Sequence, residues 1–250
     1  MQSRQGPWLS RGTVALVGTL AAIYLVSQFL RNSVGVIAPD LAREMELSAG
    51  EIGLLSSAFF FSFAAAQVPL GIAIDRYGPK RCMLICAAIA FLGTFVFAIA
   101  TTSAGLITAR ILMGLGSSCY LMAPLALYAR RFAPERFTML AGVQMAIGTI
   151  GTLFVTAPLA FASATIGWRA TFFGVAGLVV LCGALIAFVV REDAAEHAPA
   201  AHGETLRENF AGIAEVVRMR GFWPLFLMRC DTYGAGPAPP KSRRTRWESS

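Results

Sequence analysis

One apolar segment near the start of the chain carries a row of polar side chains on a single helix face. Tyr24, Ser27, Gln28 and Arg31 follow one another at helical spacing, and Asn32 adjoins them. A charged residue inside such a segment is costly unless it faces a cavity or a partner. Because the planar guanidinium group can bind two oxygens of a carboxylate or phosphate, the row predicts a binding face for a small anion. The alternative is that Arg31 extends along the helix to the membrane interface.

Polar residues in later apolar segments extend this candidate site. Arg110 either lines a cavity or braces the helices around it. Gln67 and the row of Gln144, Gly148, Gly151 and Thr152 lie either toward a pore or in helix contacts, which small residues most often serve. We predict six residues that bind the small molecule: Tyr24, Gln28, Arg31, Asn32, Arg110 and Gln144.

The residue pattern gives little support for a metal site, a cofactor site or a catalytic site. Cys82 and Cys86 share a helix face, but no histidine or carboxylate joins them as a metal ligand, so we expect buried packing cysteines. Ser117 lacks a base, because the two histidines of the chain lie in a polar segment after residue 190. A Gly-rich phosphate loop is also absent. The sequence therefore predicts no metal, no cofactor and no enzymatic activity.

The composition determines the class of protein that holds these residues. Of 250 residues, 56% are hydrophobic and 14% are charged, against roughly 25% charged in soluble domains. With so few charges a soluble protein would expose large apolar patches, and a disordered chain needs the opposite composition. The net charge of +7 is better explained by membrane topology than by nucleic-acid binding.

Six stretches are long and apolar enough to cross a membrane, which takes about 20 residues per helix. Their lengths favour helices, because barrel strands are about 10 residues of alternating polarity. The fold class predicted is therefore an all-α membrane protein. The spans are expected at residues 13–37, 52–74, 82–101, 104–129, 138–162 and 170–190.

Basic residues predict the orientation of these spans. With the N-terminal segment 1–12 in the cytoplasm, the inner connections hold nine lysines and arginines and the outer ones hold two, which follows the positive-inside rule. The first outer loop is acidic instead, with Asp40, Glu44, Glu46 and Glu51. The arginine- and alanine-rich composition suggests a bacterial source, and we predict a multi-pass protein of the inner membrane.

The end of the chain differs in character from the six spans. Residues 191–220 are polar and predict a cytoplasmic linker, and residues 221–233 resemble a seventh span that stops too early to cross. Residues 234–250 are rich in proline, glycine and arginine and predict a disordered basic tail. We expect a chain truncated at the start of its seventh helix; the alternative is a natural disordered tail.

A loop motif connects the sequence to a known family. Residues 71–81, Gly-Ile-Ala-Ile-Asp-Arg-Tyr-Gly-Pro-Lys-Arg, lie between the second and third spans and resemble the G-x-x-x-D-R-x-G-x-[RK]-[RK] signature of the major facilitator superfamily. The run from Arg110 to Gly116 is similar to the R-x-x-x-G-x-G of that family, and Gly167-Trp168-Arg169 to its G-W-R. The resemblance covers about residues 13–230, the first six-helix half and the linker.

The resemblance implies a six-helix bundle built as a 3+3 inverted repeat. It implies that the loop is a conformational latch between two halves, and Asp75 would then need a partner there. Gly71 is expected to allow another helix to approach closely. The alternative is that the basic residues of the loop only anchor topology. The predicted latch residues are Gly71, Asp75, Arg76, Gly78, Lys80 and Arg81.

The resemblance also implies a function, which is secondary active transport of a small solute by alternating access. Arg31, eight residues before Pro39, resembles the organic-anion branch of the superfamily, although Leu30 replaces the aspartate usual there. We therefore expect an organic anion such as a carboxylate as substrate, with a proton or sodium ion coupled through Asp40, Glu51 or a missing half. Besides the lipid bilayer, the partners implied are a second half or another copy. The alternative is a non-transporting fragment or assembly partner.

Overall fold

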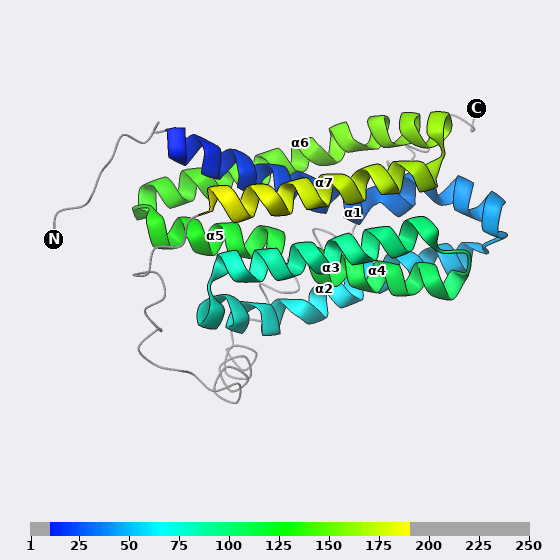
Figure 1. Ribbon diagram of the computed structural model, residues 1–250, viewed down its shortest axis with the longest axis horizontal. Helices are drawn as coiled ribbons and strands as arrows, with labels where there is room; N and C mark the ends of the chain where they lie inside the picture. The colour runs from blue at the N-terminus through cyan, green and yellow to red at the C-terminus, as the bar shows by residue number, and fades with distance from the viewer. Residues whose placement is uncertain (1–10, 191–250) are drawn as a thin grey trace, which may run out of the picture. The chain divides into compact units, whose positions relative to one another are not determined.

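The computed structural model describes residues 11–190, which belong to the first of two compact units, Met1–Ala201 and His202–Ser250. The predicted linker at 191–220, the incomplete helix at 221–233 and the tail at 234–250 lie outside the described residues. The described part is folded entirely into α-helices and contains no strand (Figure 1). The helices are α1 (Arg11–Met45), α2 (Ala49–Tyr77), α3 (Pro79–Ile99), α4 (Ser103–Ser117), α5 (Cys119–Arg131), α6 (Pro134–Ile166) and α7 (Trp168–Val189).

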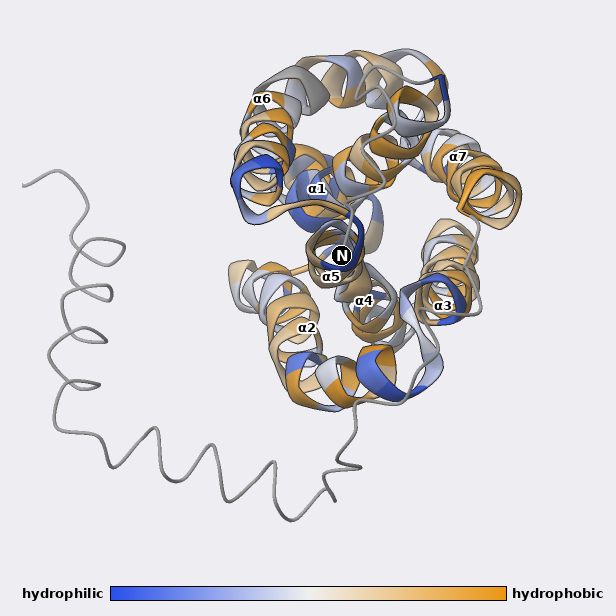
Figure 2. Cartoon of the chain, turned by 90° about the vertical axis from the view of Figure 1, so that its left-hand side faces the viewer, coloured by the Kyte–Doolittle hydropathy of each residue, from blue (hydrophilic) through white to orange (hydrophobic). Residues whose placement is uncertain are grey.

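Within residues 11–190, six helical segments are long and apolar enough to cross a membrane, and the predicted all-α fold with six spans is confirmed. Large apolar side chains cover the outside of the bundle, where Phe61, Phe161 and Phe188 are 77%, 73% and 82% exposed. Figure 2 looks along the helices and shows these hydrophobic outer faces. Side chains of this size suit a hydrocarbon solvent and would form large apolar patches in water.

The fourth span consists of two helices, α4 and α5, rather than the one that residues 104–129 predict. Pro124 has no N–H to bind the carbonyl of Tyr120, which weakens the helix in this region. One turn earlier, Ser118 donates both its N–H (3.3 Å) and its hydroxyl (2.6 Å) to the carbonyl of Leu115. This tighter turn separates the two helices within the span.

Helix α1 is longer than expected, because it ends at Met45 instead of near residue 37. Its added turns pass through Pro39 and hold Asp40 and Glu44, which the sequence places in a loop. The Asp40 carboxylate accepts a hydrogen bond from the Ser163 hydroxyl (2.7 Å), and Glu44 is bound by residues of α7. Partners distant in sequence therefore stabilise a helical extension whose local composition favours a turn.

Small residues bring the helices close together in the core. A side chain at Gly93 would collide with the backbone of Met113, one at Gly114 with Phe59, and one at Gly116 with Ala90. These contacts join α3 and α4 to each other and α4 to α2, and α3 packs on α7 as well. Gly71 does not act in this way: nothing described lies within 4 Å of a Cβ placed there, so the expected close approach at Gly71 is wrong for this bundle.

The two ends of the bundle differ in charge. The basic end holds the α2–α3 connection, the end of α5 and the start of α1 and α6; the acidic end holds the end of α1 and the α6–α7 connection. The described side chains that define the basic end are Arg11, Asp75, Arg76, Lys80, Arg81, Arg130, Arg131, Glu135 and Arg136. Those that define the acidic end are Asp40, Arg43, Glu44, Glu46, Glu51 and Arg169.

Candidate functional site

The polar face of α1 points into contacts with two other helices. Ser27 donates to the carbonyl of Ser117 in α4 (3.5 Å), and the Gln28 amide donates to the carbonyl of Gly148 in α6 (3.4 Å). Asn32 instead donates to the carbonyl of Gln28, one turn before it in the same helix (2.8 Å). The predicted helix face is therefore directed into the bundle and not toward lipid.

Arg31 lies near the middle of α1, half-buried, and faces two aromatic rings of α2. Its guanidinium carbon is 4.5 Å from the ring centre of Phe63 and 5.9 Å from that of Phe60. The Nε atom is buried, and within residues 11–190 the side chain forms no hydrogen bond or ion pair. An aromatic face attracts a cation but leaves its N–H donors free. Arg31 is thus a cation positioned in the bundle with capacity for a ligand.

Arg110 occupies a different environment from Arg31. It is fully buried at 1% exposure, and its Nη1 donates to the carbonyl of Leu30 (2.7 Å) and to the hydroxyl of Ser33 (3.4 Å). The rings of Phe59 and Phe97 lie at 5.0 and 5.9 Å from its guanidinium carbon. Arg110 therefore braces α4 against the turn of α1 that carries Arg31.

Gln144 also connects helices. Its amide nitrogen donates to the carbonyl of Leu20 in α1 (3.0 Å), and its amide oxygen accepts from the hydroxyl of Tyr128 in α5 (3.2 Å). A Cβ at Gly148, the next turn of α6, would collide with the ring of Tyr24. In this conformation Tyr24 and Gln144 form the close contact between α1 and α6.

The predicted latch motif lies at the basic end. The Asp75 carboxylate pairs with the Arg130 guanidinium of α5 at 3.2 Å, so Asp75 has a partner within the bundle. Arg76 lies over the ring of Tyr77, and Arg81 is exposed. The Lys80 amine donates to the carbonyl of Ala187 near the end of α7 (2.8 Å).

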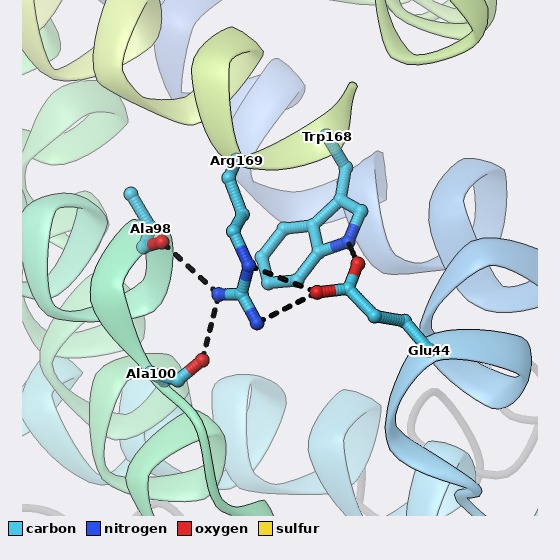
Figure 3. Close-up of polar contacts among 5 residues, drawn as sticks. All are labelled: Glu44, Ala98, Ala100, Trp168 and Arg169. Atoms are coloured by element: carbon cyan, nitrogen blue, oxygen red, sulfur yellow. Dashed lines mark hydrogen bonds and ion pairs between the residues drawn. The ribbon is translucent and has the colours of Figure 1, made fainter.

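At the acidic end, Arg169 and Trp168 of α7 contact both α1 and the end of α3 (Figure 3). The Arg169 guanidinium pairs with the Glu44 carboxylate at 2.9 Å and donates to the carbonyls of Ala98 (3.2 Å) and Ala100 (2.7 Å). The indole N–H of Trp168 donates to the other oxygen of Glu44. These contacts join three helices at one point.

Sequence reasoning missed the aromatic and acidic partners of the site. Phe60 and Phe63 belong to an apolar run, and only their spacing of three residues indicates a shared face. Glu44 was placed in the acidic loop, and no local signal connects it to Arg169, which lies far along the chain. Gln67, for which the sequence allowed either a pore or a packing position, has a buried amide oxygen that finds no hydrogen-bond partner among residues 11–190.

A model of the Major Facilitator Superfamily matches residues 20–235. The chain is 22% identical over 182 residues to a probable sulfoacetate transporter of Cupriavidus necator, covering 73% of this chain and 42% of the relative. It is 28% identical to a 3-(3-hydroxy-phenyl)propionate transporter of Escherichia coli, with 72% and 44% covered. It is also 28% identical to an efflux pump of Mycolicibacterium smegmatis, with 75% and 43% covered.

The chain thus spans less than half the length of each of these relatives. The transporter names agree with the prediction that the chain is not an enzyme. The family match extends over most of the chain and over all six spans, and it includes the loop motif at residues 71–81. On this evidence the chain is a multi-pass membrane protein and belongs to the Major Facilitator Superfamily.

Proposed function

We propose that this chain is the first six-helix half of a secondary active transporter for a small organic anion. One observation carries the proposal: Arg31 lies half-buried in the middle of a membrane-spanning helix without an ion pair among residues 11–190. A charge in that position is costly and usually serves a ligand or a partner. A carboxylate satisfies the guanidinium fork with two parallel hydrogen bonds.

The residues around Arg31 support an anionic ligand over a cationic one. Phe60 and Phe63 surround the guanidinium with apolar surface that strengthens its field. Arg110 of α4 adds a second positive charge, bound to the carbonyl of Leu30 next to Arg31. The relatives named for sulfoacetate and for a phenylpropionate are consistent with an organic acid.

The remaining predicted residues have different roles in this proposal. Gln28 and Asn32 flank Arg31 and are the polar contacts of the substrate. Arg110, Tyr24 and Gln144 hold α1 in this conformation, and they reach the substrate only if α1 moves against α4 and α6.

Transport requires a second bundle that rocks against this one around the site. We propose that a second six-helix half or another copy of the chain supplies it, and that the N-terminus lies in the cytoplasm of an inner membrane, at the basic end. The Asp75–Arg130 pair at that end is then the latch that opens as the bundles move. A coupled proton or sodium ion requires a carboxylate, for which Asp40, Glu51 or the second half are the candidates.

The test is ligand binding to the purified chain in nanodiscs, with sulfoacetate and 3-phenylpropionate as probes. We expect Arg31→Lys to weaken binding about tenfold or more, because lysine keeps the charge but loses the planar fork. Arg43→Lys, on the exposed side of the same helix, is the matched control and is expected to leave affinity unchanged. Unchanged affinity in Arg31→Lys would contradict the assignment.

Uptake into liposomes tests separately whether the chain is one half of a transporter. We expect little uptake by the chain as a monomer, and robust uptake by a monomer would overturn this part of the proposal. A chain that binds neither probe yet co-purifies stably with another membrane protein would instead be the non-transporting assembly partner.

A further inference from the structure

Among residues 11–190, three buried polar atoms on α1 and α2 near the proposed anion site have no hydrogen-bond partner. They are Nε of Arg31, Oε1 of Gln28 and Oε1 of Gln67. Each such atom costs about 1–3 kcal/mol when it is left unsatisfied, so buried groups of this kind usually have a partner in the functional state. One of the three is a donor that requires an acceptor, and two are acceptors that require donors.

Helix register places these three residues near one another along the seam between α1 and α2. The two helices are antiparallel neighbours, and Arg31 lies level with Phe63. Gln28 lies one turn from Arg31 toward the basic end, and Gln67 lies one turn from Phe63 in the same direction. At 1.5 Å per residue both glutamines are displaced by about 5 Å, which keeps them level with each other.

Both glutamines also share a face with the residue that marks the site. At 100° per residue, Gln67 is rotated by about 40° from Phe63, and Gln28 by about 60° from Arg31. The amide nitrogen of Gln28 is engaged by the Gly148 carbonyl, which holds this side chain in place and leaves its oxygen free. The α1–α2 seam therefore holds a cation at one level and two amide oxygens one turn away.

The chemistry that complements this border is an acid group together with neutral hydrogen-bond donors. A carboxylate satisfies Arg31, and hydroxyl groups one or two bonds further along the ligand donate to the glutamine oxygens. An ammonium group would donate as well, but it would lie beside Arg31, with Arg110 of α4 bound to the adjacent carbonyl of Leu30. No carboxylate is among the described side chains that contact Arg31. Like charges at this separation repel, so a hydroxyl is the better donor.

We propose that Gln28 and Gln67 determine specificity for hydroxylated organic acids, with Arg31 holding the carboxylate. This inference rests on the proposed anion transport and narrows its substrate class. A site built to bind a hydroxyl discriminates strongly against an analogue that lacks it, because the polar groups of the protein are then left unpaired.

The experiment compares three six-carbon probes, gluconate, hexanoate and 6-aminohexanoate, by titration calorimetry on the chain in nanodiscs. For the unaltered chain we expect gluconate to bind at least tenfold more tightly than hexanoate and than 6-aminohexanoate. Gln28→Met and Gln67→Met, which nearly conserve volume, are each expected to reduce the ratio of gluconate affinity to hexanoate affinity about tenfold. Thr149→Val on the exposed face of α6 is the control, with no expected change.

The possible outcomes distinguish this inference from the proposed anion transport on which it rests. If Arg31→Lys weakens both acids but neither glutamine variant alters the preference, anion binding stands and the glutamine assignment is wrong. Tighter binding of 6-aminohexanoate than of gluconate would overturn the choice of hydroxyl. If none of the three probes binds, both proposals fail. Should one variant not fold, the other still tests the assignment, because the two residues lie on different helices.

Discussion

The turns at Gly78 and Gly167 lie at opposite ends of the bundle and are built alike. Gly78 has φ 86° and ψ 154°, and Gly167 has φ 85° and ψ 153°. Two residues after each glycine stands a cation, Lys80 or Arg169, near the start of α3 or α7. The α2–α3 and α6–α7 connections thus share one backbone conformation in opposite orientations.

The cations of these turns bind each other's helix. Lys80 of α3 donates to a carbonyl near the end of α7, and Arg169 of α7 donates to two carbonyls at the end of α3. Positive charge at a helix C-terminus also complements the helix dipole. Helices α3 and α7 therefore clasp one another reciprocally, which is the arrangement expected of two inverted three-helix repeats.

The two clasps differ in the side chains that complete them. At the acidic end, the forked guanidinium of Arg169 reaches two carbonyls and Glu44, so α1 joins the clasp. At the basic end, lysine presents a single point charge, and the ion pair nearby is that of Asp75 with Arg130. The two connections therefore have the same backbone conformation, while their side chains make different contacts at the two ends of the bundle.

Substitution of the residue between the glycine and the cation is expected to give the largest difference in stability between the two ends. Trp168 is 3% exposed and packs on the rings of Phe97 and Phe172, so Trp168→Ala should lower the free energy of unfolding by about 3 kcal/mol. Pro79→Ala removes far less volume and should lower it by about 1 kcal/mol or less. Unfolding in mixed micelles measures both, and equal losses would refute the asymmetry.

The glycines themselves should respond equally, which tests the shared backbone. Both occupy a region of φ and ψ that is nearly restricted to glycine, so Gly78→Ala and Gly167→Ala should each destabilise the bundle by about 2 kcal/mol. At Gly167 no described atom lies within 4 Å of an added Cβ, so the cost there is conformational alone. A loss confined to one of the two positions would show that the turns are not equivalent.

Exchanging the two cations tests whether Arg169 and Lys80 contribute differently to stability. Arg169→Lys keeps the charge but cannot bind Glu44 and both carbonyls together, so we expect a loss of about 1 kcal/mol. The reciprocal change Lys80→Arg should alter stability by less than about 0.5 kcal/mol, because arginine keeps the positive charge and can also donate to the carbonyl of Ala187. Faster hydrogen exchange at the start of α7 in Arg169→Lys, but not in Lys80→Arg, would support the assignment.

The smallest effect is expected at the ion pair of the basic end. The Asp75 side chain is 73% exposed, and exposed pairs contribute between 0 and about 1 kcal/mol, so Asp75→Asn should hardly change thermal unfolding. If this pair is a latch, its loss should appear in conformation instead. Greater labelling of a cysteine introduced at Ala73, compared with the same cysteine beside an intact Asp75, is the measurement; a large loss of stability would contradict this account.

Much of the fold could be predicted from the composition and from the spacing of hydrophobic and polar residues. Six spans, the loop motif and the polar face of α1 follow from hydrophobic length and helical spacing, which are local properties. The end of α1 could not be predicted, because Pro39, Asp40 and Glu44 favour a loop until Ser163, Trp168 and Arg169 bind them. The break at Ser118 was missed for a related reason, since proline is common in membrane helices that do not break.

The sequence by itself determined that this protein spans a membrane and carries a cation, Arg31, in its first span, because transfer from water to hydrocarbon depends on residue type and order alone. Only the tertiary structure decided which arginine is hydrogen-bonded to another helix of the bundle. In the sequence, Arg110 and Arg31 are alike, since each is an arginine inside an apolar span. In the structure, Arg110 donates hydrogen bonds to a carbonyl and a hydroxyl group of α1, whereas Arg31 faces aromatic rings. The physical reason is that a hydrogen bond requires a partner within about 3 Å, and that partner comes from another helix.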